Sequence, residues 1–118
     1  MREVSVSLQD AAKAAAFALY LGENTAFVGL SLTHQAAVRR AVADFVASSC
    51  DCCHLMTAGR TLTLAGNASI VFPLMRSEVR GMVVDHLFVR SKDWSKPEIR
   101  ESFSACLMGS RNPAVHVG

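Results

Sequence analysis

The chain has 118 residues, of which 51% are hydrophobic and 19% charged, and this composition excludes an intrinsically disordered protein. The longest uncharged runs, residues 24–38 and 61–75, are too short and too polar to form the ~18-residue apolar helix that spans a membrane. The net charge of +2 does not by itself indicate a nucleic-acid-binding protein, and residues 1–5 lack the apolar core of a secretion signal. We therefore expect one domain over residues 1–118, cytoplasmic (in the host cell if the protein is viral), with no membrane partner.

The first predicted helix begins after Ser7 and runs to Leu21. Ser7 is a suitable N-cap, Asp10 lies in the first turn where an acid is favourable, and Gly22 suits the end of the helix. Lys13 is the one charge between Ala11 and Leu21, so the helix is apolar on almost all sides. A helix of this kind packs against neighbours on several sides.

A short buried strand is predicted at residues 25–32, followed by a second helix from about Gln35 to Ser49 with Thr33 as its cap. The buried stripe of this helix is predicted at Val38, Val42, Phe45 and Val46. Arg40 and Asp44 are four residues apart, a spacing at which they can form a weak ion pair.

The remaining pattern predicts further strands and one more helix. Residues 60–64 alternate polar and apolar side chains, and residues 69–72 resume this character after a turn, which predicts a β-hairpin. A central strand is expected at residues 82–89. A helix begins at Ser95–Glu98, which has the spacing of a capping box, and ends at Gly109. Its buried stripe is Ile99, Phe103, Cys106 and Leu107. A last strand is expected at residues 114–117. This order favours an α/β fold: a three-layer sandwich with a mostly parallel sheet plus the hairpin.

The cysteine pattern has two interpretations. Cys50, Cys52, Cys53 and His54 suggest zinc, but structural zinc usually takes two separated pairs of ligands, and no second pair exists. We expect no metal in a single chain, leaving open a site completed by two chains. The preferred interpretation is free thiols at a helix end, where the helix dipole opposes formation of a thiolate.

Candidate groups for hydrolysis are scattered. They are Ser31, His34, His54, Asp85 and His86. No Gly-x-Ser-x-Gly elbow is present, and Asp85 and His86 are neighbours on one predicted strand, so they point to opposite faces. We therefore predict no catalytic residues and a protein that is not an enzyme.

Three segments, in this order, resemble nucleoside-triphosphate-driven motor cores. Residues 25–36 resemble the second strand and helix of such cores, residues 66–72 (Gly-Asn-Ala-Ser-Ile-Val-Phe) resemble their Asn-containing segment, and residues 79–89 resemble the Arg-Gly turn and the following metal-binding strand. Together, over about residues 7–95, they are most similar to the ATPase domain of the large terminase subunit of tailed phages, and more loosely to helicases. The resemblance implies a phage origin and an ATPase-like fold.

Two departures from that family concern its chemistry. The sequence has no Gly-x-x-x-x-Gly-Lys-Ser/Thr phosphate loop, and the strand that should end in Asp-Glu ends instead in Val89, Arg90 and Ser91. We therefore expect a degenerate relative of the P-loop ATPase core, with no cofactor. A disfavoured alternative is a nucleotide-binding subunit whose missing groups come from another chain.

Binding is then the expected activity, and two kinds of partner are considered. A protein partner, host enzyme or viral machine, is preferred, with Trp94 as its anchor if the indole is exposed. The alternative is a nucleic-acid-binding accessory related to DNA-packaging motors. Its phosphate-binding residues would be Arg76, Arg80, Arg90, Lys92 and Lys96. Self-association through an unpaired sheet edge is a further expectation.

Overall fold

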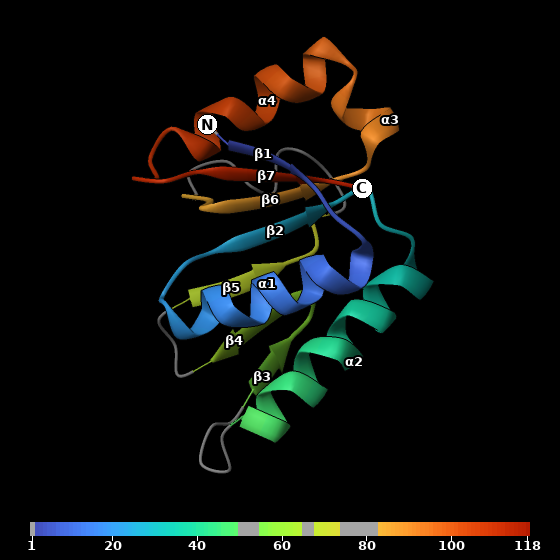
Figure 1. Cartoon of the computed structure of the whole chain (residues 1–118), viewed down its shortest axis with the longest axis vertical. Coiled ribbons are helices and arrows are strands. Elements are labelled where there is room, and N and C mark those ends of the chain that lie inside the picture. Colours follow the sequence, from blue (N-terminus) through green and yellow to red (C-terminus); the bar gives the residue numbers. More distant parts are fainter. Residues whose placement is uncertain (1, 50–54, 65–67, 74–82) are drawn as a thin grey trace.

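A seven-stranded sheet forms the centre of the computed structural model, which describes residues 2–49, 55–64, 68–73 and 83–118 (Figure 1). The strand order is β1-β7-β6-β2-β5-β4-β3. The strands are β1 (Arg2–Ser5), β2 (Thr25–Val28), β3 (Leu55–Ala58), β4 (Thr61–Leu64), β5 (Ala68–Val71), β6 (His86–Val89) and β7 (Ala114–Val117). The helices are α1 (Leu8–Tyr20), α2 (Leu32–Ser49), α3 (Ser91–Trp94) and α4 (Pro97–Leu107).

The sheet has a parallel part and an antiparallel part. Strands β1, β7, β6, β2 and β5 run parallel, whereas β4 is antiparallel to both β5 and β3. Helices α1 and α2 lie on one face of the sheet, and α3 and α4 lie at the other (Figure 1). The predicted α/β sandwich with a mostly parallel sheet is confirmed, and the predicted hairpin is β4 and β5.

Each face of the sheet has its own apolar core, because side chains alternate along every strand. On the α1 and α2 face, Phe27 packs between Phe72 and Phe88, with ring centroids 5.5 and 5.3 Å away. On the α4 face, the strand side chains that alternate with those of the first core pack against Phe103 and Leu107 of α4. Alanines of α1, including Ala12 and Ala16, lie against the first core and let the helix approach the strands closely.

The boundaries differ from the predicted ones where distant or local contacts decide them. Strand β1 was not predicted, because it is defined by pairing with β7 at the far end of the chain. Helix α2 begins at Leu32 rather than near Gln35, because the Ser31 hydroxyl, not that of Thr33, accepts the hydrogen bond from His34 N. The Ser95 hydroxyl donates to the Lys92 carbonyl, so it does not cap α4. No helix in the described ranges is long and apolar enough to cross a membrane.

Candidate functional site

The five parallel strands end at one edge of the sheet, the edge at which open α/β sheets bind ligands. Three of these strands lead directly into helices. Two residues, Val6 and Ser7, connect β1 to α1; residues 29–31 connect β2 to α2; and Arg90 alone connects β6 to α3. A phosphate loop of the Gly-x-x-x-x-Gly-Lys type has about eight positions. None of these three connections is long enough to contain one.

Backbone hydrogen bonds close the carboxyl edge between β1 and β6. Val6 N donates to the Val117 carbonyl at 3.0 Å, and Ser91 N donates to the Gly118 carbonyl at 3.0 Å. A Cβ on Gly118 would lie 2.7 Å from the Val6 carbonyl oxygen and 3.1 Å from the Phe88 ring. The end of β7 is therefore packed tightly beside the connection from β1 to α1. The Ser7 hydroxyl accepts from Asp10 N at 3.1 Å, which confirms its role as N-cap.

Three of the five predicted phosphate-binding cations lie in one described segment at this edge. Arg90 is half-buried at the end of β6, and Lys92 and Lys96 are exposed on and after α3. Lys96 Nζ lies 3.8 Å from Asp93 Oδ1. The two other predicted cations, Arg76 and Arg80, lie outside the described residues. The described part of the site thus holds three cations of which one is paired with a carboxylate.

The Asp93 carboxylate is a feature of this edge that the sequence analysis missed. Gly29, at the end of β2, has a φ of +76°, and a Cβ there would lie 2.8 Å from Asp93 Oδ2. Glycine is therefore required twice, by its backbone conformation and by the approach of Asp93. In the described ranges no group of three His, Cys, Asp or Glu side chains is arranged to hold a metal ion.

Trp94 is buried, with only 6% of its surface exposed, and this corrects one prediction. Its indole Nε1 donates to Glu3 Oε1 at 2.7 Å, which links α3 to strand β1. The Arg100 guanidinium lies 5.4 Å from the indole ring and Nε of the same residue donates to the Trp94 carbonyl. Because the indole is not exposed, the prediction that Trp94 anchors a partner loses its physical basis.

The amino edge of the sheet carries a dense network of side-chain hydrogen bonds. Asn24, which precedes β2, donates from Nδ2 to the Val83 carbonyl and accepts at Oδ1 from Ser69 N on β5. Asp85 Oδ2 accepts from Asn24 N at 2.8 Å. Asn24 and Asp85 therefore join the starts of β2, β5 and β6.

Two histidines extend this network. His86 Nε2 lies 3.1 Å from Glu23 Oε1, and His86 Nδ1 lies 3.3 Å from His116 Nε2 on β7. Ser31, the candidate nucleophile, caps α2 at the opposite, carboxyl edge of the sheet. The structure therefore places Ser31 at the opposite edge from His86 and Asp85, with His34 beside it in the first turn of α2, and it does not bring Ser31, His86 and Asp85 together.

The cysteine candidates divide between described and undescribed residues. Cys50, Cys52, Cys53 and His54 lie outside the described residues. Cys106 is buried on α4 against the sheet, and burial raises the pKa of its thiol. A thiol with a raised pKa is a poor nucleophile at neutral pH, so Cys106 is a core residue.

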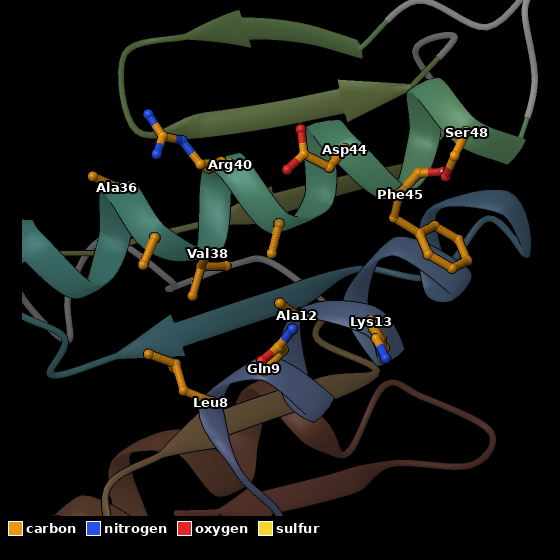
Figure 2. A pocket seen from close by; sticks show the side chains of 12 residues that line it. Leu8, Gln9, Ala12, Lys13, Ala36, Val38, Arg40, Asp44, Phe45 and Ser48 are labelled. Carbon is orange, nitrogen blue, oxygen red and sulfur yellow. The ribbon is translucent and has the colours of Figure 1, made fainter.

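A groove of about 810 Å³ lies between α1 and α2 (Figure 2). Small and apolar side chains line much of it, including Leu8, Ala12 and Ala41. Arg40 and Asp44 project from the same side of α2, away from α1 (Figure 2). The predicted ion pair between these two residues is not among the ion pairs of the described residues. The exposed alanines of α2 were the sequence signal that could have revealed this face.

Comparisons with known proteins give a fold but no family. No protein-family model matches the sequence, and no curated protein matches it significantly. Among solved structures, the ATPase domain of the large terminase of Thermus phage P74-26 is similar, with a TM-score of 0.76 and 12% sequence identity over 99% of this chain. The HK97 bacteriophage large terminase is similar with a TM-score of 0.63, also at 12% identity. The chain spans 59% of the former and 29% of the latter. It therefore has a fold like that of phage large terminase ATPase domains.

Proposed function

We propose that this chain is a phage DNA-packaging-related protein that does not hydrolyse nucleotide and acts in the host cytoplasm by docking on a protein partner. The terminase-like fold supports the setting. The observation that carries the absence of hydrolysis is the length of the connections at the carboxyl edge. With one to three residues between strand and helix, the described connections after β1, β2 and β6 are too short for a loop of backbone amides and lysine that encloses a triphosphate.

The exposed end of α1 is the surface that best suits a protein partner. Phe17 is 58% exposed, Leu21 is 73% exposed, and Tyr20 lies between them in the same last turn. The Phe17 ring also packs on Phe45 of α2, with 5.1 Å between ring centroids, and this contact restricts its position. Fixed, exposed aromatic and aliphatic side chains are typical of the residues that dominate binding at protein interfaces.

The experiment compares capture of proteins from a phage-infected host lysate by three forms of the tagged chain. The Phe17→Ser, Leu21→Ser double variant should lose a protein that the wild-type chain retains. Met108→Ser is the matched control, because Met108 is also an exposed apolar residue but follows α4 at the other face of the sheet. Equal capture by all three forms would exclude the α1 end as the docking surface, and capture of nucleic acid alone would replace this proposal with the alternative.

The alternative is that the chain is a nucleic-acid-binding accessory. The observation in its favour is the concentration of Arg90, Lys92 and Lys96 in one segment of a fold shared with DNA-packaging motors. Each neutralised phosphate steepens the salt dependence of DNA affinity. Arg90→Ala with Lys92→Ala should therefore flatten that dependence by about two phosphate contacts. Arg111→Ala, an exposed cation before β7 at the amino edge, should leave it unchanged. Undetectable DNA binding at low salt would exclude this alternative.

A further inference from the structure

The outer face of α2 has an unusual composition for a helix that faces solvent. Four of the ten exposed positions of the helix are alanine (Ala36, Ala37, Ala43 and Ala47), and Arg40 and Asp44 are the charges among them. An exposed helix face normally carries many charged or long polar side chains. Small side chains instead allow a second helix to approach closely, and the groove of about 810 Å³ beside this face adds apolar surface.

Arg40 and Asp44 lack partners within the described part of the chain, although they are one helical turn apart. Both side chains leave the same side of α2 (Figure 2). Neither makes a hydrogen bond or ion pair with a described residue. These two exposed charges are complementary to a partner surface that carries one anion and one cation in the opposite order.

A second copy of α2 in antiparallel orientation provides that order. Val42 lies between Arg40 and Asp44 in the sequence and points into the core. If the two-fold axis passes at the level of Val42, a residue n positions before Val42 in one copy lies at the same height as the residue n positions after Val42 in the other copy. Among the residues on the side of α2 away from the core, those that then share a level across the two copies are Ala36 with Ser48, Ala37 with Ala47, Arg40 with Asp44, and Ala41 with Ala43. Every one of these pairs is small with small, except the pair of opposite charges, which occurs twice.

We propose that the chain forms a two-fold symmetric dimer in which α2 packs antiparallel against α2 of a second copy, held in register by two reciprocal Arg40–Asp44 ion pairs. The close approach of the two helices places apolar surface of the groove in the interface. The charge pairs mainly select the partner and its orientation, because the wrong register sets like charges against each other. This inference does not depend on the proposed function.

The test is sedimentation equilibrium of the full chain over a wide range of protein concentration, with variants that reverse each charge. In both symmetry-related contacts of the dimer, Arg40→Asp alone places an acid opposite Asp44 of the other copy. Asp44→Arg alone places a cation opposite Arg40 of the other copy. Each should raise the dimer dissociation constant at least about tenfold. The double charge swap, Arg40→Asp with Asp44→Arg, restores opposite charges and should return the constant to near the wild-type value.

Three controls separate dimerisation from folding and from net charge. The circular dichroism spectrum and unfolding midpoint of each variant should match the wild type, since both residues are exposed. Arg111→Asp makes the same change of charge at a distant exposed site and should not alter the dissociation constant. Ala47→Glu places a bulky acid in the close contact and should abolish the dimer independently of the charge pair. A wild-type chain that stays monomeric overturns the proposal. So does a dimer whose dissociation constant neither single charge reversal changes, and so does a double-swap variant that dimerises more weakly than both single variants.

Discussion

The two edges of the parallel sheet are built by different means. At the amino edge, side chains of Asn24, Asp85 and His86 connect the starts of the strands through hydrogen bonds. At the carboxyl edge, where ligands meet this kind of sheet, short connections and backbone hydrogen bonds join β1, β6 and β7. The richer network of polar side chains therefore holds strands together, and it lies at the edge opposite the one where open α/β sheets usually bind ligands.

The largest expected effect comes from the amino edge. Asn24→Ala removes a donor to the exposed Val83 carbonyl and the acceptor of the part-buried Ser69 N, and so breaks the side-chain link between β5 and the start of β2. We expect the free energy of unfolding to fall by about 2–3 kcal/mol, measured by urea denaturation. The matched control is Asn112→Ala, in the exposed turn before β7, which should cost less than about 0.5 kcal/mol. Similar losses in the two variants would mean that the network does not hold the strands.

The next effect tests the carboxyl edge. Gly29→Ala forces a side chain into a backbone conformation with positive φ and against Asp93 Oδ2, so the free energy of unfolding should fall by roughly 1–2 kcal/mol. Adding Asp93→Ala should recover part of this loss, because it removes the contact but not the backbone strain. An unchanged loss in the double variant would show that Asp93 does not approach Gly29.

A smaller effect concerns the link between α3 and β1. Trp94→Phe keeps the ring but loses the hydrogen bond from the indole to Glu3, and should lower the free energy of unfolding by about 1 kcal/mol. In the Glu3→Ala background the same substitution should cost clearly less, since the acceptor is already absent. Additive losses in this double-mutant cycle would contradict the contact.

The smallest effect is a pH dependence at Cys106. Burial raises the pKa of this thiol in the folded state, so its contribution to stability is fully present below the unfolded pKa of about 8.5 and is lost as the pH rises through the folded value. We expect the midpoint of thermal unfolding, measured in a series of buffers from about pH 8 to about pH 10, to fall more for the wild type than for Cys106→Ala. Parallel curves for the two proteins would remove the thiol from the account.

Much of the fold could be predicted from local patterns in the sequence. The helical period gave α1 with its Ser7 cap, and alternation of polar and apolar residues gave the β4–β5 hairpin. Strands β1 and β3 could not be found in this way. Among the described strands, β1 pairs with β7 alone, more than a hundred residues later in the chain, and no local signal encodes that contact.

The candidate site was less predictable than the fold. The cations at residues 90–96 were recognised by type, but the pairing of Lys96 with Asp93 depends on a turn that the sequence assigned to a helix cap. The burial of Trp94 depends on Glu3, which is 91 positions away. The short connections at the carboxyl edge follow from strand and helix ends, and these are the least certain part of any sequence pattern.

Because the described connections after β1, β2 and β6 are short, we claim that this chain binds no triphosphate at the carboxyl edge of its terminase-like sheet. The direct test is isothermal titration of the purified chain with ATP and magnesium, with phosphate release followed in the same samples. We predict no heat of binding and no release above that of buffer. Stoichiometric binding together with turnover that Arg90→Ala or Lys92→Ala abolishes would contradict the claim.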